Sequence, residues 1–382
     1  FLLSAVSITR FCTMPKIKTP VEPRRDKYQP VLGIRDAVQW TSETLPRMQW
    51  MSELVLDKID ANQELINDPL SVLPPSAKKV LLELPKIAWI TVGLFVIDTL
   101  FMLTLITLTE FGFVYRWFTT LLLTLAMFVM FSVSHDAAHG SISNISWVNG
   151  IIGRISFPFL GPGASFPLFR YIHQMHHKHT NHPVNDPDRF CSHGNSMFNN
   201  PLFIPLRCLV LSGSYFVFYV KHVPNRPKLE VLEVSVFIAI QLGILFEAYS
   251  RGYGYAVFSY YIIPGILSHG LLGFFFDFIP HHHEEATTPI ENRYRTTSML
   301  QTYWFLQPVL SLLLQYQDYH LIHHLYPTIP FYRYADKWRE KQDFLKEKQV
   351  TINHLTVEEV VKTTKQKAAS ISSRLPAGIK VQ

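Results

Sequence analysis

Histidine is the residue type whose spacing in this sequence is best suited to chemistry. The 382 residues include 17 histidines, and eight of these fall in three short clusters. The clusters read HDAAH, HQMHH and HLIHH, and their histidines are His135, His139, His173, His176, His177, His320, His323 and His324. Residues three or four positions apart lie on one face of a helix, so each cluster directs its imidazoles the same way. Three clusters with this spacing indicate a shared metal site rather than solvated surface histidines.

A further group of three histidines, His281, His282 and His283, directly follows Pro280. One imidazole from this triplet and eight from the clusters make nine donors, too many for one ion but suitable for two. Imidazole binds zinc, copper, iron and nickel. The sequence has no CxxC pair, no HExxH and no Glu-x-x-His motif of soluble di-iron bundles, and Cys191 has no sequence partner. The spacing therefore predicts a two-ion imidazole site and leaves the metal open.

Acidic residues next to the clusters are candidates to orient the imidazoles. They are Asp136, Asp186, Asp188 and Asp318. A metal-bound imidazole usually donates its other N–H to a carboxylate or a carbonyl group. Helix capping explains Asp186 and Asp188 equally well. Asp98 lies inside an apolar segment, where we expect it to make a hydrogen bond within a helical bundle.

Four apolar segments are predicted to cross a membrane and to position the clusters. They are residues 87–109, 117–134, 231–249 and 252–276. Each is long enough to cross about 30 Å of hydrocarbon as a helix, and short connections join them into two antiparallel hairpins. Hydrophobic residues make up 48% of the chain and charged residues 17%, which favours a membrane protein over a soluble one. Residues 201–220 and 299–316 contain prolines and are predicted to be interfacial helices.

The predicted fold class is an all-α membrane protein with four transmembrane helices, interfacial helices and a cytosolic histidine-rich cap. Residues 1–86 form a polar basic arm, residues 87–337 a membrane catalytic domain and residues 338–382 a polar tail. Residues 1–11 resemble a targeting segment, and translation from Met14 is the alternative. Positive charge is enriched on the cytoplasmic side of membrane proteins, and an even number of spans separates the arm from every cluster. We therefore expect the clusters on the cytoplasmic or stromal side.

The order of one HxxxH and two HxxHH clusters resembles the membrane fatty-acid desaturase and hydroxylase superfamily. The likeness covers about residues 87–337 and implies a non-haem di-iron centre that activates O2. The stretches HDAAHG, HHKHTNHPVNDPDRF, DFIPHHH with ENRYR, and DYHLIHHLYPTIPFYRY are most similar to desaturase-type β-carotene hydroxylases and ketolases. Those enzymes carry a Leu-Pro-His element where this chain has Ile279, Pro280 and His281. The resemblance thus implies His281 as the ninth ligand, although the His triplet departs from the family pattern.

The resemblance implies O2-dependent oxidation of a long apolar lipid, with hydroxylation of a carotenoid ring expected and fatty-acyl desaturation as the alternative. Phenylalanines such as Phe157 and Phe276 are candidates to line the substrate entrance. Because the chain has no Cys cluster, GxGxxG motif or fused haem domain, electrons must come from a separate donor, by resemblance ferredoxin or a b-type cytochrome. The net charge of +6 suits an acidic donor or anionic lipid headgroups, and no motif supports nucleic-acid binding.

A histidine-rich metal transporter is the alternative from another functional class. Transport sites lie near the middle of the bilayer. In this chain only His269 lies well inside a predicted span, whereas the clusters lie at or beyond the span ends. The positions of the clusters therefore favour an enzyme.

Overall fold

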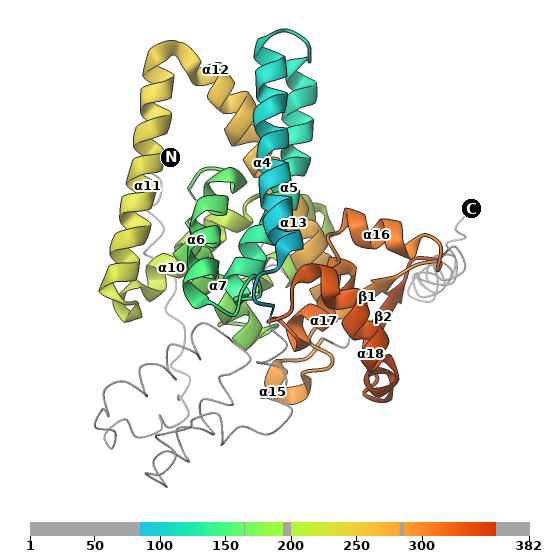
Figure 1. The fold of residues 1–382 in the computed structure, drawn as a ribbon. Coiled ribbons are helices and arrows are strands. Elements are labelled where there is room, and N and C mark those ends of the chain that lie inside the picture. Colours follow the sequence, from blue (N-terminus) through green and yellow to red (C-terminus); the bar gives the residue numbers. More distant parts are fainter. Residues whose placement is uncertain (1–84, 164, 194–199, 283–285, 357–382) are drawn as a thin grey trace, which may run out of the picture.

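A computed structural model describes residues 85–163, 165–193, 200–282 and 286–356 of the chain. The described fold is mostly helical, with two long helical hairpins that extend from the same side of a base of shorter elements (Figure 1). The predicted N-terminal arm lies almost entirely outside the described residues, as do His283 and the end of the C-terminal tail.

The first hairpin consists of α4 (Trp89–Glu110) and α5 (Arg116–His139). Their sequences are rich in Leu, Ile, Phe and Met, and the connection turns at Gly112, whose φ of 80° suits a residue without a Cβ. Helix α5 continues beyond the predicted end at residue 134 to His139 and is capped by Gly140, which has a left-handed φ of 68°. The HDAAH cluster therefore belongs to the last turns of the same helix.

The second hairpin begins with α11 (Lys228–Ala248) and reverses in η6 (Tyr249–Tyr253), where Gly252 has a φ of 88°. It returns through α12 (Gly254–Val257), η7 (Phe258–Ile262), α13 (Ile263–Leu272), η8 (Gly273–Phe278) and α14 (Ile279–His281). The π-helical turns η7 and η8 interrupt the α-helical hydrogen bonding, a feature common near functional sites. Three helices in the described residues are long and apolar enough to cross a membrane, namely Trp89–Glu110, Arg116–His139 and Lys228–His281.

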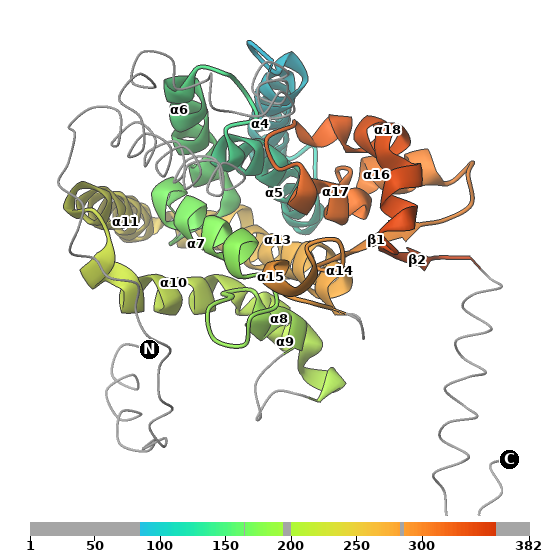
Figure 2. The same cartoon turned by 90° about the horizontal axis from the view of Figure 1, so that it is seen from below.

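The base contains the remaining short elements. Between the hairpins these are α6 (Ser146–Ser156), η3 (Phe157–Leu160), α7 (Phe166–His179), α8 (Arg189–His193), η4 (Pro201–Phe203), α9 (Ile204–Leu209), α10 (Leu211–His222) and η5 (Val223–Asn225). After the second hairpin they are α15 (Pro289–Asn292), β1 (Ser298–Gln301), α16 (Gln307–Leu313), η9 (Gln317–Tyr319), α17 (His320–Leu325), η10 (Phe331–Arg333), α18 (Tyr334–Glu347) and β2 (Thr351–His354). In the view of Figure 2, α7 and α10 lie on one side of α13, with α17 and α18 on the other.

The prediction of an all-α fold is wrong in one place. Residues 298–301 form β1, which pairs in parallel with β2 in the register Ser298↔Thr351, so the predicted helix 299–316 is replaced by a strand and the short helix α16. Residues 201–220 hold η4 and two short α-helices, α9 and α10, which meet at Val210. The predicted domain boundary at 337 falls inside α18, whose Trp338 and Leu345 side chains are buried.

The largest core cluster joins the two hairpins to α6 and α7. Leu123, Met130 and Val133 of α5 pack there with Phe166 of α7, and all four are buried. Helix α5 is thus held on several sides, which fixes the direction of its terminal histidines. Asp98 of α4 is buried too, but the hydrogen bond expected for it is not found, since its Oδ2 has no partner within the described residues.

Candidate metal centre

Nine imidazoles from four helices converge in the base, next to the C-terminal end of α5. In the first histidine group, the donor atoms lie within 4.8 Å of one another on His135, His139, His173 and His323. In the second histidine group, the same limit holds for His176, His281, His320 and His324. The ninth ring, His177, lies between the groups, with its Nε2 2.9 Å from the Nε2 of His323 and its ring stacked on His324.

Helical spacing explains how each element contributes its rings. Helix α5 supplies two histidines, α7 and α17 supply three each, and α14 supplies His281. The prediction that each cluster forms one face of a helix is therefore confirmed. Of the triplet, His281 joins the second group, whereas the Nδ1–H of His282 donates to the Ser192 carbonyl at 2.9 Å.

The separations between the rings fit ligands that share metal ions. Neighbouring Nε2 atoms are 2.7 Å apart in the pair His139–His173, 3.1 Å in His281–His320 and 3.3 Å in His176–His324. Two nitrogens bound at about 2.1 Å to one ion, at right angles to each other, lie about 3 Å apart. The donor set is therefore well suited to two cations with about four imidazoles each.

The electrostatics of the rings agree with this geometry. Burial, followed by the charges of neighbouring histidines, holds the pKa of His173, His177, His320, His323 and His324 well below its usual value. These rings are therefore neutral and each offers a nitrogen lone pair. Because lone pairs that face one another at about 3 Å repel, a cation between them is the arrangement that stabilises the cluster.

The second histidine group is supported by polar side chains. The Nδ1–H of His176 donates to Asp186 at 2.8 Å and lies 3.2 Å from a carboxylate oxygen of Asp188. Burial opposes the charged form of His176, but these two carboxylates raise its pKa to about 9. The Nδ1–H of His320 donates to Gln317 at 2.8 Å. In both His176 and His320 the Nδ1–H is thus used in a hydrogen bond, and Nε2 is the atom available to bind a metal ion.

The first histidine group is supported mainly by aromatic rings. His173 stacks on Phe169 with ring centroids 5.3 Å apart, and Phe131 lies 5.5 Å from His135. The Nδ1–H of His323 donates to the hydroxyl of Tyr334 at 3.0 Å. In the described part of the chain, the Nδ1 atoms of His135 and His139 have no hydrogen-bond partner.

Two of the four carboxylates proposed to orient histidines have other partners. Asp136 accepts hydrogen bonds from the Thr91 hydroxyl and the Phe331 N–H, so it links α5 to α4 and to η10. Asp318 accepts from Gln307 and Ser311, both at 2.6 Å. For these two residues the predicted contact with an imidazole is wrong, whereas Asp186 and Asp188 do meet His176.

Two supporting residues were missed by the sequence analysis. Gln317 precedes His320 by three positions, a spacing that places both on one face and could have been noticed. Tyr334 is eleven positions after His323 and meets it only because α18, which begins at Tyr334, packs against α17. Cys191 also has an unexpected neighbour, since its sulfur lies 3.4 Å from that of Cys208.

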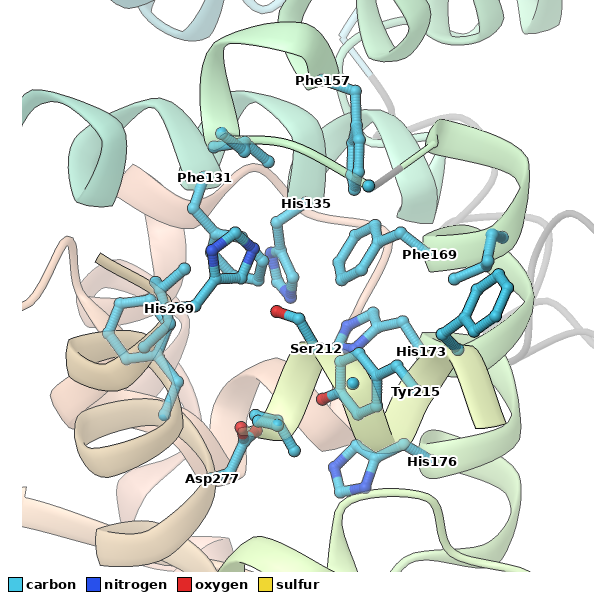
Figure 3. Close-up of a pocket in the computed structure, with 18 of the residues that line it drawn as sticks. Phe131, His135, Phe157, Phe169, His173, His176, Ser212, Tyr215, His269 and Asp277 are labelled. Carbon is cyan, nitrogen blue, oxygen red and sulfur yellow. The ribbon is translucent and has the colours of Figure 1, made fainter. Parts of the chain in front are cut away.

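A cavity of about 410 Å³ opens beside the two groups, between α5, α7, α10 and α13 (Figure 3). His135, His173, His176 and His320 form one part of its wall. Apolar side chains dominate the remainder, namely Phe131, Phe157, Leu160, Leu168, Phe169, Leu211, Phe216, Ile238, Leu272 and Phe276. An apolar chain in this cavity would lie directly against the histidines.

Comparison with known proteins places the chain in a family. The sequence profile of the fatty acid desaturase family matches residues 112–356, more than half of the chain. The chain therefore belongs to the fatty acid desaturase family, and the matched region contains both histidine groups and the cavity.

Individual relatives are distant. The chain is 26% identical over 229 residues to a dihydrorhizobitoxine desaturase of Bradyrhizobium elkanii, covering 53% of this chain and 60% of the relative. It is 29% identical over 153 residues to an sn-1 acyl-lipid omega-3 desaturase (ferredoxin) of Nostoc, covering 35% and 42%, respectively. An sn-1 oleoyl-lipid 12-desaturase of Anabaena variabilis is 26% identical over 219 residues, covering 55% and 50%. The chain thus spans about half the length of these relatives.

Proposed function

We propose that this chain is a membrane-embedded, O2-dependent oxidoreductase with a non-haem di-iron centre, and that it acts on a long apolar lipid. The observation that carries the proposal is the convergence of nine imidazoles beside an apolar cavity. The proposed ligands are His135, His139, His173, His176, His177, His281, His320, His323 and His324. Membership of the desaturase family favours an oxidoreductase over a metal transporter.

The side chains of the site have separate roles in this proposal. Bound as a pair, ferrous ions supply the reduction of O2 and the removal of hydrogen from an unactivated C–H bond. Asp186 holds the Nδ1 proton of His176, which keeps Nε2 available as a donor. The phenylalanines Phe131, Phe169 and Phe276 exclude water and direct an apolar chain past the histidines.

Desaturation of a fatty-acyl chain is the reaction that the relatives favour, because they include acyl-lipid desaturases and a fatty acid conjugase. Hydroxylation of a carotenoid ring is the second candidate and rests on the Ile279, Pro280 and His281 element. That element does bring His281 into the second group. The two reactions differ in whether a second hydrogen is lost or oxygen is added.

The proposed topology has four membrane crossings. The apolar helix Lys228–His281 is 54 residues long and reverses at Gly252, so it supplies two crossings, and α4 and α5 supply the others. All nine histidines then lie on one side of the membrane, proposed to be cytoplasmic or stromal. A separate donor would reach them from that side. Ferredoxin is one such candidate, as in the name of the Nostoc relative, and a b-type cytochrome is the other.

Expression of the chain in a β-carotene-producing host, together with a ferredoxin and its reductase, tests the proposal. Pigments and total fatty acids are analysed in parallel. A new acyl double bond supports desaturation, and a hydroxylated pigment supports ring hydroxylation. If neither product forms while the purified chain contains stoichiometric iron, the proposed function is wrong.

A further inference from the structure

Most polar groups that line the cavity lie close to the second histidine group. The Tyr215 hydroxyl lies beside the carboxyl group of Asp188. The carboxyl groups of Asp188 and Asp277 lie next to each other, and Asp188 also contacts His176. Gln317 accepts the N–H of His320. These polar groups therefore belong to the surroundings of the second histidine group.

Ser212 is an exception. It lies in the first turn of α10, and its hydroxyl oxygen is turned toward the middle of the cavity in Figure 3. Serines in helices usually donate to a carbonyl three or four residues earlier, as Ser214 does to Leu211 at 2.7 Å. Ser212 makes no hydrogen bond to any described residue. Its donor thus faces the cavity without a partner.

His269 is the second exception. Its Nδ1 lies 2.6 Å from the carbonyl oxygen of Gly265. A carbonyl can only accept, so Nδ1 carries the proton and Nε2 keeps a lone pair as an acceptor. The ring lines the cavity but belongs to neither histidine group. In the part of the chain described here, its Nε2 receives no hydrogen bond.

An unsubstituted hydrocarbon chain would leave both groups unsatisfied. Burying a polar group against apolar atoms without a hydrogen bond is costly, and the cost falls on any ligand that cannot supply the missing partner. A hydroxyl group supplies an acceptor for Ser212 and a donor for His269. Ser212 and His269 come from α10 and α13, two helices that pack together beside the metal centre.

We propose that Ser212 and His269 are specificity-determining residues that select an apolar chain carrying a hydroxyl group. This inference rests on the proposed function, in which the cavity holds the substrate. The selected ligand is then a hydroxylated acyl or alkyl chain, placed so that its hydroxyl meets α10 and α13 while a neighbouring carbon lies against the histidines.

A displacement assay tests this selection without requiring turnover. The full chain, loaded with iron and placed in lipid nanodiscs, is equilibrated with radiolabelled methyl octadecanoate. Unlabelled methyl octadecanoate and each of its monohydroxylated positional isomers are then compared as competitors. We expect at least one isomer to compete about five- to tenfold better than the parent ester, as one or two satisfied hydrogen bonds would give.

Variants assign the preference to the two residues. Ser212→Ala and His269→Phe should each remove most of it, and Ser212→Thr, which keeps a hydroxyl, should retain it. Ser214→Ala is the matched control on the same helix and should leave the ratio unchanged, because its hydroxyl is used by Leu211. Comparing ratios between variants cancels differences in partitioning of the competitors into lipid.

Two results would overturn the inference. One is that no isomer competes better than the parent ester, as expected if the two side chains merely hold a water molecule. The other is that the preference survives in both Ser212→Ala and His269→Phe. A clear preference in a chain that forms no oxidised lipid would contradict the proposed function alone, and product formation without a preference would contradict this inference alone.

Discussion

Both histidine groups offer imidazole nitrogens to a metal ion, and they differ in the side chains that contact these imidazoles from outside the group. The second group is supported by the carboxylates of Asp186 and Asp188 and by the amide of Gln317. Behind the first group are the rings of Phe131 and Phe169 and the neutral hydroxyl of Tyr334. A carboxylate that accepts the outer N–H makes an imidazole a stronger donor, which an aromatic ring does not. For the proposed two-ion centre, the comparison predicts two unequal metal positions, with the tighter one in the second group.

Loss of a proposed ligand from either group should have the largest effect. We expect His176→Ala and His323→Ala each to lower activity by more than about 100-fold, beyond the 10- to 100-fold typical of an outer supporting residue. Product analysis in the expression host measures this. His354→Ala is the control, since His354 is exposed at the end of β2, and it should behave as the parent chain. Full activity in either of the first two variants would remove that residue from the ligand set.

Replacing the supporting carboxylate should weaken the second group selectively. In Asp186→Asn the Nδ1–H of His176 keeps a neighbour but loses the negative charge of Asp186, so we expect metal affinity or activity to fall by about 10- to 100-fold. Asp318→Asn is a matched control, because Asp318 is buried nearby but accepts from Gln307 and Ser311 rather than a histidine. Equal metal loss in both variants would mean that charge, and not contact with His176, governs binding.

Graded removal of metal should reveal the inequality in the parent chain. With a chelator of increasing concentration, we expect two steps of metal release, the first from the position of the first histidine group. The affinities should differ by about tenfold, the lower end of the effect of an outer carboxylate. Metal content after dialysis, measured in the parent and in Asp186→Asn, checks this. If the Asp186 carboxylate causes the difference in affinity between the two metal positions, the two steps of metal release should merge in Asp186→Asn.

The smallest effect is expected for Tyr334→Phe, which removes one neutral hydrogen bond from His323 and preserves the ring. A loss of about two- to tenfold in activity corresponds to one hydrogen bond of this kind. Steady-state rates in membranes from the expression host measure it. A loss of activity larger than that of Asp186→Asn would mean that the first group depends more on its supporting contact than the second group does.

The sequence predicted much of this centre because its signals are local. Spacing of three and four residues places the imidazoles on helix faces, and the length of the apolar segments predicts the helices of the two hairpins. The outer contacts depend instead on tertiary packing. Asp136 and Asp318 are next to the clusters in the sequence, yet their side chains turn to Thr91 and Ser311. Tyr334 reaches His323 only through the path of the chain after α17.

The small sheet escaped prediction for a related reason. Strands β1 and β2 have four residues each and pair across about fifty residues of sequence, so neither carries a long alternating pattern. The apolar residues of β1 instead predict part of an interfacial helix over residues 299–316. The pairing places β2, near the end of the described residues, beside the strand that precedes α16.

Metal analysis of the purified full chain, expressed under anaerobic iron supplementation, tests the central claim most directly. Element analysis combined with iron K-edge X-ray absorption should find two irons per chain, each surrounded mainly by imidazole nitrogens. Stoichiometric zinc without iron, or a single iron with oxygen and sulfur ligands, would contradict the two-ion centre and with it the proposed oxidation of lipids.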